Sequence, residues 1–220
     1  MQVKMRDLPC KAGAIWAYTE EAMKVTEIFY SLQGEGVWLG KPAVFLRLGG
    51  CLAPYCPWCD TRYAWDEARD MDQETVLESM AHYNCRNAVI TGGEPLLQWQ
   101  ELAALHERLI ERGYAILYET SGKAGIPRIE GATVVCSPKY INHAWRIDPA
   151  ALARADYFKF IYHYQSSEQA IMQFIRDNRL ETEKVYIMPE GSTRRAQLGL
   201  MAQTFDFCRK EGLTMTPRLH

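Results

Sequence analysis

The segment PAVFLRLGGCLAPYCPWCDT, residues 42–61, places an apolar strand directly before a loop that carries three cysteines. Four residues separate Cys51 from Cys56 and two separate Cys56 from Cys59, so one loop can direct three soft thiolates to one point. Three thiolates on a four-iron, four-sulfur cluster leave one iron open, whereas a closed structural site needs a fourth ligand. No Cys or His lies within ten residues of the loop. The pattern favours a reactive cluster, and a zinc site completed by a distant ligand is the alternative.

The composition of the 220 residues is ordinary for a globular protein, 48% hydrophobic and 24% charged. A net charge of −2 gives no electrostatic reason to expect nucleic acid or a membrane surface as a partner, and no apolar run has transmembrane length. Three of the seven cysteines are bunched in one loop, which indicates ligands in a reducing cytoplasm rather than disulfides. Small buried or incidental thiols are expected at the other four, Cys10, Cys85, Cys136 and Cys208.

The chain divides at Met23, where MKVTEIFYSLQGEG opens with the pattern of a strand and would make a natural chain start. Residues 1–22 lack the apolar core of a signal peptide. We expect them to form an N-terminal extension, either disordered or the product of an upstream start site. Residues 23–220 are expected to form one catalytic domain.

Beyond Met23, short β-rich runs alternate with amphipathic helical windows. This alternation predicts an α/β fold with a parallel sheet and crossover helices. About six strands are too few for a closed eight-stranded barrel, so we expect an incomplete, TIM-type barrel. The expected strands are 43–48, 88–91, 115–120, 133–136, 157–161 and 185–188, and the expected helices are about 73–83, 97–112, 149–155, 167–178 and 194–211.

Polar or glycine-rich motifs follow five of these strands. Because the carboxyl ends of parallel strands meet at one edge, these motifs are expected to form a single active site. The motifs are the cysteine loop, TGGEP (91–95), ETSG (119–122), SPK (137–139) and MPEG (188–191).

An open cluster iron needs a chelating ligand, and an amino-carboxylate can provide one. Gly92 and Gly93 would let backbone approach such a ligand, Glu94 would fix the loop or accept from its ammonium, and Lys139 would supply a positive charge. The alternative is that TGGEP is only a tight strand-to-helix turn.

The order of these motifs resembles the radical S-adenosylmethionine superfamily. Within it, the chain is similar from about Met23 onward to the 7-carboxy-7-deazaguanine synthase family, on the motifs FYSLQGEG (29–36), PAVFLRLGGC (42–51), CDT (59–61), TGGEP, ETSG and SPK. The gap of four residues between Cys51 and Cys56 is one longer than the family's more usual three.

The resemblance implies a role for residues at each matching position. Cys51, Cys56 and Cys59 would hold the [4Fe-4S] cluster, and Thr61 would be a Mg2+ ligand. S-adenosylmethionine would contact Trp58, Cys59, Asp60, Gly93, Glu94, Thr120, Ser121, Ser137, Pro138, Lys139, Met188, Pro189, Glu190 and Gly191. The pterin-type substrate would contact Leu32, Gln33, Gly34, Glu35, Arg47, Thr91 and, near the chain end, His220.

The resemblance also implies a radical carbon–nitrogen lyase that converts 6-carboxy-5,6,7,8-tetrahydropterin to 7-carboxy-7-deazaguanine, with loss of ammonia, in queuosine biosynthesis. A homodimer and an electron donor such as flavodoxin are expected as partners. Two alternatives stay open: a radical enzyme that activates a glycyl-radical partner, and a non-catalytic zinc or iron–sulfur module. The LQGEG motif and Arg47 argue against the glycyl-radical activating enzyme.

Overall fold

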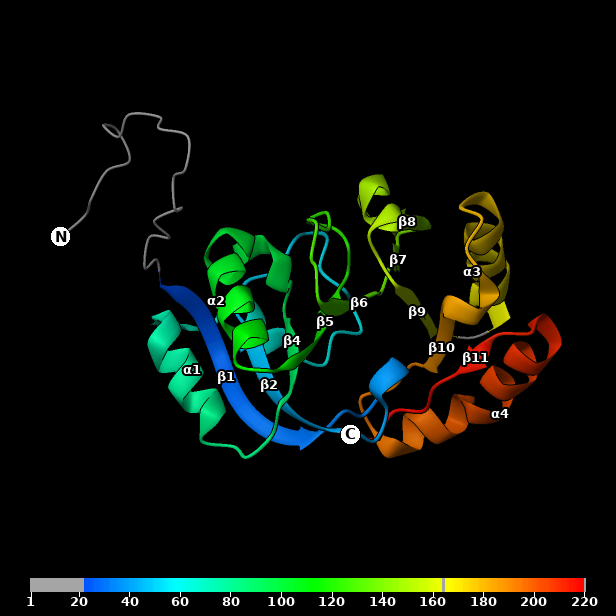
Figure 1. Cartoon of the computed structure of the whole chain (residues 1–220). Helices are drawn as coiled ribbons and strands as arrows, with labels where there is room; N and C mark the ends of the chain where they lie inside the picture. The colour runs from blue at the N-terminus through cyan, green and yellow to red at the C-terminus, as the bar shows by residue number, and fades with distance from the viewer. Residues whose placement is uncertain (1–21, 164, 220) are drawn as a thin grey trace.

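A computed structural model describes residues 22–163 and 165–219, in which one large sheet carries the site (Figure 1). The predicted N-terminal extension, residues 1–21 of it, and His220 lie outside the described residues. The strands are β1 (Met23–Leu32), β2 (Pro42–Leu48), β3 (Arg69–Met71), β4 (Asn87–Gly92), β5 (Ala115–Thr120), β6 (Ala132–Cys136), β7 (Lys139–Ile141), β8 (Ala144–Arg146), β9 (Tyr157–Tyr162), β10 (Val185–Pro189) and β11 (Thr214–Met215). The α-helices are α1 (Gln73–Ala81), α2 (Trp99–Glu111), α3 (Gln165–Asp177) and α4 (Arg194–Glu211). Short 3-10 helices are η1 (Gly36–Trp38), η2 (Arg62–Trp65), η3 (Pro95–Gln98), η4 (Pro149–Ala153) and η5 (Thr182–Lys184).

The sheet has the strand order β11-β10-β9-β6-β5-β4-β2-β1-β3. Within this sheet, all pairings along the order from β2 to β11 are parallel, and β1 pairs antiparallel with both β2 and β3. β7 and β8 form a separate antiparallel pair. The six predicted strands are all present, so the prediction of an α/β fold with a largely parallel sheet is confirmed. Within the described segments, no helix is both long and apolar enough to cross a membrane.

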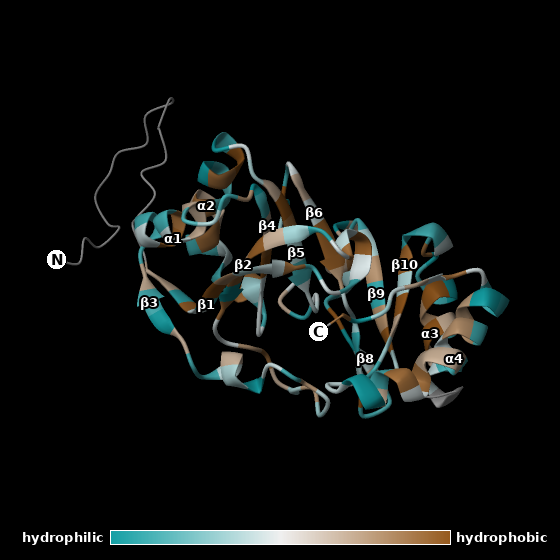
Figure 2. Ribbon diagram, turned by 90° about the horizontal axis from the view of Figure 1, so that it is seen from below, coloured by the Kyte–Doolittle hydropathy of each residue, from teal (hydrophilic) through white to brown (hydrophobic). Residues whose placement is uncertain are grey.

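The two faces of the sheet have different neighbours, because successive side chains of a strand point to opposite sides. On one face, alternate strand residues such as Leu46, Ile90 and Phe160 join one apolar core with side chains of all four helices. On the other face, Phe45, Val89, Leu117 and Val135 pack around Trp38 of η1. Figure 2 shows the strands as largely apolar, with hydrophilic residues on the outer turns of α1 and α4.

Local capping explains where several helices begin. Thr193 accepts a hydrogen bond from the Ala196 amide at 3.2 Å, and α4 then fills its predicted window, residues 194–211. Asp148 caps the Ala150 amide at 2.9 Å, but the helical window predicted at 149–155 is only a 3-10 helix. The window at 97–112 begins as the 3-10 helix η3 and becomes α-helical at Trp99.

Replacement of Leu102 by alanine tests the helix-covered core. Leu102 of α2 is fully buried, so Leu102→Ala is expected to lower the free energy of unfolding by about 2–5 kcal/mol in a denaturant titration. Leu198→Ala is the matched control, because Leu198 lies on α4 with 57% of its surface exposed; its effect should stay within about 0.5 kcal/mol. Equal losses in the two variants would contradict the described core.

Candidate active site

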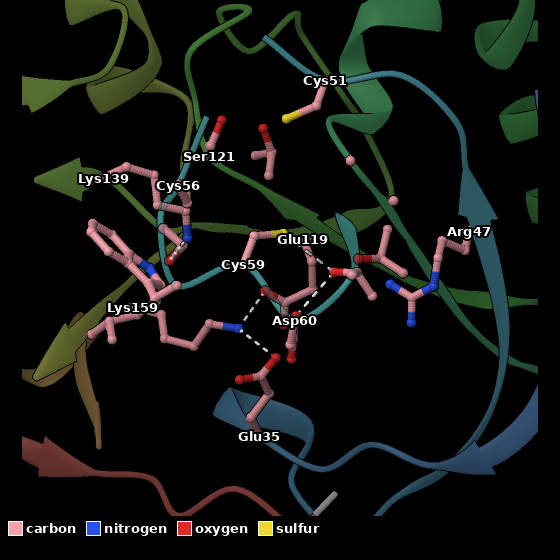
Figure 3. Close-up of a pocket in the computed structure, with 18 of the residues that line it drawn as sticks. Glu35, Arg47, Cys51, Cys56, Cys59, Asp60, Glu119, Ser121, Lys139 and Lys159 are labelled. Atoms are coloured by element: carbon pink, nitrogen blue, oxygen red, sulfur yellow. Dashed lines mark hydrogen bonds and ion pairs between the residues drawn. The ribbon is translucent and has the colours of Figure 1, made fainter. Parts of the chain in front are cut away.

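A cavity of about 480 Å³ opens at the carboxyl edge of the parallel strands (Figure 3). Sixteen of the residues predicted to form the site line it, which confirms that the motifs after separate strands meet in one place. They are Gln33, Glu35, Arg47, Cys51, Cys56, Trp58, Cys59, Asp60, Thr61, Thr91, Gly93, Thr120, Ser121, Ser137, Lys139 and Met188.

The cysteine loop covers one side of this cavity, and all three of its thiols are partly buried and free. The Cys59 amide donates to the Cys56 carbonyl at 3.1 Å, which closes the second half of the loop into a turn. Burial raises the pKa of the Cys51 thiol, and the nearby Lys123 ammonium acts in the opposite direction. No three Cys, His, Asp or Glu side chains of the described residues are gathered closely enough to hold a single metal ion.

The glycine pair 92–93 packs the strand end of β4 against the start of this loop. A Cβ on Gly93 would lie 2.1 Å from the Gly50 carbonyl oxygen, and one on Gly92 would lie 2.2 Å from that of Leu48. Only residues without side chains allow this approach. The glycines therefore bring two backbones together as well as lining the cavity.

Glu94 lies behind the cavity wall and is fully buried. Its carboxylate accepts hydrogen bonds from the Thr120 hydroxyl at 2.6 Å, the Ser121 amide at 2.9 Å and the Ser121 hydroxyl. Its own amide donates to the Gly50 carbonyl at 2.8 Å. Of the two functions predicted for Glu94, this geometry supports fixing the loop.

A buried charge cluster lies at the centre of the cavity (Figure 3). The Lys159 ammonium lies 2.7 Å from a Glu119 carboxylate oxygen and 3.3 Å from one of Glu35. Burial alone would lower the pKa of Lys159, but the two carboxylates outweigh it and raise that pKa above its usual range. Burial raises the pKa of Glu119, and Lys159 opposes this shift. Gln33 donates to the other Glu119 oxygen at 3.4 Å.

Arg47 is fixed by neighbours on the antiparallel side of the sheet. Its Nε donates to Glu27 at 2.7 Å, and the Tyr63 hydroxyl donates to the same oxygen at 2.8 Å. The guanidinium also lies over the rings of Phe29 and Tyr63, 5.8 and 5.9 Å from their centroids. These contacts leave the far end of the planar guanidinium directed toward the cavity that Arg47 lines.

The opposite wall carries Lys139, which donates to the Ser137 hydroxyl at 2.8 Å. Burial lowers the pKa of this ammonium. Trp58 packs edge-on against the ring of His163, with ring centroids 4.3 Å apart. His163 in turn pairs with Glu190. The indole is thereby held beside the cysteine loop.

The C-terminal segment crosses the open side of the sheet and returns to the loop before η1 (Figure 1). The Leu219 amide donates to the Gly34 carbonyl at 2.9 Å, and Thr216 accepts from the Gly36 amide at 2.8 Å. Arg218 pairs with Asp60 and also donates to the Gly191 carbonyl at 3.2 Å. This segment closes one side of the cavity.

Seven predicted site residues in the described chain do not line the cavity. Leu32 is exposed, and Glu94 lies behind the wall. The carbonyl of Gly34 accepts from the Leu219 amide and that of Gly191 from the Arg218 guanidinium. The others are Pro138, Pro189 and Glu190.

Several lining residues were not predicted from the sequence. Lys159 occupies the cavity face of β9, and a lysine between apolar residues of that strand was the available signal. Glu119 was predicted only as part of the ETSG motif, without a function of its own, and lies on the cavity face of β5. Arg218 gave no such signal, because its place depends on the path of the chain end. The remaining ones are Phe45, Tyr63, Trp65, Val89, Lys123, Ile161 and Ser192.

Three of the four cysteines outside the loop can be compared with the expectation, since Cys10 lies outside the described residues. Burial raises the pKa of Cys136 to about 12 and of Cys208 to about 11, so both thiols stay protonated and unreactive. Cys85 is half-buried and directs its thiol to the Pro42 carbonyl at 3.4 Å.

A three-thiol loop at the carboxyl edge of a largely parallel α/β sheet, facing a polar cavity, is the arrangement of the radical S-adenosylmethionine enzymes. No family model matches the chain. A 7-carboxy-7-deazaguanine synthase from Hyperthermus butylicus is 33% identical, over 90% of this chain and 91% of the relative. A 7-carboxy-7-deazaguanine synthase from Pyrobaculum aerophilum is 32% identical, over 90% of this chain and 93% of the relative. The crystal structure of QueE from Escherichia coli matches with a TM-score of 0.75 and 25% identity, over 90% of this chain and 95% of that one. The chain belongs to the 7-carboxy-7-deazaguanine synthase family.

The buried charge cluster predicts a pH-dependent loss of stability when its cation is removed. In Lys159→Met, Glu119 and the partly exposed Glu35 are left together without a cation, which should cost about 3–5 kcal/mol of unfolding free energy at neutral pH. The folded-state pKa of Glu119 rises further in this variant. A carboxyl group with a raised folded pKa contributes stability at low pH and loses it as pH rises through that pKa. The loss should therefore be larger at pH 8 than at pH 5 in denaturant titrations.

Lys24→Met is the control, because it breaks an exposed pair with Asp70 and should change stability by less than about 1 kcal/mol at both pH values. Adding Glu119→Gln to Lys159→Met should recover part of the loss at pH 8. A loss that is the same at both pH values would contradict the cluster's assigned charge state.

Proposed function

We propose that this protein is a 7-carboxy-7-deazaguanine synthase, a radical carbon–nitrogen lyase of queuosine biosynthesis. It converts 6-carboxy-5,6,7,8-tetrahydropterin to 7-carboxy-7-deazaguanine with loss of ammonia. The observation that carries the proposal is one polar cavity lined together by three cysteine thiols, Arg47 and the LQGEG loop residues Gln33 and Glu35, in a chain of this family.

Cys51, Cys56 and Cys59 would hold a [4Fe-4S] cluster with one open iron. The donor set fits: three soft thiols of one loop face a cavity with room for a cofactor. When bound, the cluster and S-adenosylmethionine would supply the radical chemistry at C6 of the substrate. Lys139 would bind the cofactor's carboxylate, with Ser137 as its hydroxyl partner, and Thr120 and Ser121 would lie near its ribose.

Several residues predicted to contact the cofactor would instead hold in place the residues that do contact it. Glu94 would position Thr120 and Ser121 by accepting their hydrogen bonds, and Glu190 would position Trp58 through His163. Gly93 would allow the cysteine loop to lie against β4. Direct contacts would come from Trp58, Asp60 and Met188, which line the cavity.

The substrate would bind against the β1–β2 side of the cavity. Arg47 would bind the substrate carboxylate through the two terminal nitrogens that Glu27 leaves available, and a planar guanidinium suits a carboxylate. Gln33, Glu35 and Thr91 would read the donor and acceptor edges of the pterin ring. Phe45 and Val89 line the same cavity and would help exclude water, which a radical reaction requires.

A Mg2+ ion would use the Thr61 hydroxyl, completed by substrate oxygens and water. Thr61 lies in the cavity and donates to Asp60 at 3.0 Å, so an acidic oxygen is already next to it. We further propose that the sheet is an incomplete TIM-type barrel, and that the protein is a cytoplasmic homodimer reduced by a donor such as flavodoxin.

Turnover by the reconstituted protein tests the proposed function. Anaerobically reconstituted enzyme with reductant, S-adenosylmethionine and the carboxylated tetrahydropterin should form 7-carboxy-7-deazaguanine, detected by mass spectrometry. Cys51→Ala, Cys56→Ala and Cys59→Ala should each abolish turnover because each removes a cluster ligand. Cys85→Ala is the matched control and should retain both iron and activity, because Cys85 lies outside the cavity.

The other outcomes identify the alternatives. Cleavage of S-adenosylmethionine with an untouched pterin would reject the substrate and favour an activating enzyme. Stoichiometric zinc without iron uptake would favour a non-catalytic binding module.

Arg47→Ala should weaken productive pterin binding while leaving the cluster intact. The side chain lies against Glu27 and Tyr63 rather than the cysteine loop, so iron content and the visible absorption spectrum should not change. The KM for the pterin should rise by about tenfold or more, as expected for loss of a charge-assisted pair of about 1.5–3 kcal/mol. Loss of the cluster in this variant would contradict the assigned function of Arg47.

A further inference from the structure

The segment Leu52–Tyr55, between the first two cysteines, is held by few contacts. It forms no backbone–backbone hydrogen bond with any other described residue. Buried or half-buried carbonyl groups need donors, and an unsupported loop would leave the position of Cys51 relative to Cys56 poorly defined. Two contacts from elsewhere in the chain meet this need.

The first contact is a single ammonium group. Lys123 donates to the Leu52 carbonyl at 2.5 Å and to the Pro54 carbonyl at 3.2 Å. These two carbonyls lie at alternate positions of the four-residue gap, so one side chain ties both halves of it. The second contact is the stacking of Tyr55 on Trp65, with ring centroids 4.3 Å apart.

The backbone of Lys123 is itself held in place by its neighbours. It follows Gly122, whose φ of +72° and close approach to Cys136 leave no room for a side chain: a Cβ there would lie 2.7 Å from the Cys136 sulfur. The Lys123 amide donates to the Ser121 hydroxyl at 3.3 Å, and that hydroxyl is bound to Glu94. The Glu94 amide also donates to the carbonyl of Gly50, the residue before Cys51. Glu94 therefore links the backbone of Lys123 to the start of the cysteine loop.

The charge of Lys123 suits this place. Its side chain lines the cavity that the three thiols face, and three thiolates gathered there repel one another. A nearby ammonium reduces that repulsion while its hydrogen bonds hold the loop. Arginine would keep the charge and the donors, whereas methionine would keep only the length.

We propose that Lys123 is a positioning residue that fixes Leu52–Tyr55 and so holds Cys51 at the separation from Cys56 and Cys59 that the cluster requires. This inference rests on the proposed function, because it assumes that the three cysteines bind a cluster. It gives the four-residue gap a physical support that comes from the segment after β5.

The test compares Lys123→Met with Lys123→Arg in the reconstituted holoenzyme. Iron loss to an added chelator should be about tenfold or more faster in Lys123→Met, as for other residues that orient metal ligands, and close to wild type in Lys123→Arg. In the apo protein, deuterium uptake of peptides covering residues 51–59 should rise in Lys123→Met alone, while uptake in β5 stays unchanged. Lys184→Met, an exposed lysine that pairs with Glu181 and does not line the cavity, is the control for loss of a charge.

Each outcome has one reading. A wild-type protein that takes up no iron–sulfur cluster rejects the proposed function. A wild-type cluster with equal iron loss and equal loop exchange in Lys123→Met overturns the inference about Lys123, as does failure of Lys123→Arg to restore slow iron loss. If Lys123→Met does not fold, Lys123→Leu, which also removes both the charge and the donors, supplies the same comparison.

Discussion

The active site depends on one buried carboxylate. Glu94 follows β4, accepts hydrogen bonds from the residues that end β5, and through its amide holds Gly50 at the start of the cysteine loop after β2. A fully buried carboxylate would be costly without such partners, so the three strand ends must stay together for Glu94 to be satisfied. The adjacent glycines make this approach sterically allowed, since a Cβ on Gly93 would overlap the Gly50 carbonyl. The loop that carries the thiols is therefore positioned by the interior of the sheet rather than by its own residues.

Because side chains alternate along each strand, the residues of the apolar core and the residues that line the cavity lie on opposite faces of the sheet. Ile116 and Tyr118 of β5 pack into the helix-covered core, whereas Glu119 faces the cavity. On β9, Phe158 and Phe160 are in the core and Lys159 lies between them on the other face. Lys159 and Glu119 can then enter the interior of the sheet without a gap in the apolar core, because neither shares a face with the helices. The cost is that Lys159 and Glu119 must be paired with each other.

Much of the fold followed from the sequence because strand alternation, helix caps and cysteine spacing are local signals. Six parallel strands and the bounds of α4 were predicted on this basis, and the rim motifs met as expected. Long-range pairings could not be predicted. The pairing of β1 with β3, the Arg218–Asp60 ion pair and the support of Leu52 by Lys123 each join residues far apart in the chain. A glutamate or lysine inside an apolar strand also predicts an edge strand or a solvent-exposed position until its partner on another strand is known.

The pairing of charges in the cavity indicates where an added anion would bind. Lys159 is neutralised by Glu119 and Glu35, Arg218 by Asp60, and Arg47 in part by Glu27. Within the described part of the chain, Lys139 has a hydroxyl partner, Ser137, but forms no salt bridge. Burial lowers its pKa, which means that its charged form is poorly solvated and gains most from a new negative partner. A carboxylate delivered to this wall would supply that partner, and Lys139 lies across the same cavity from Arg47. Two cations on opposite walls suit two separate carboxylates, one on an amino-carboxylate cofactor and one on the pterin substrate.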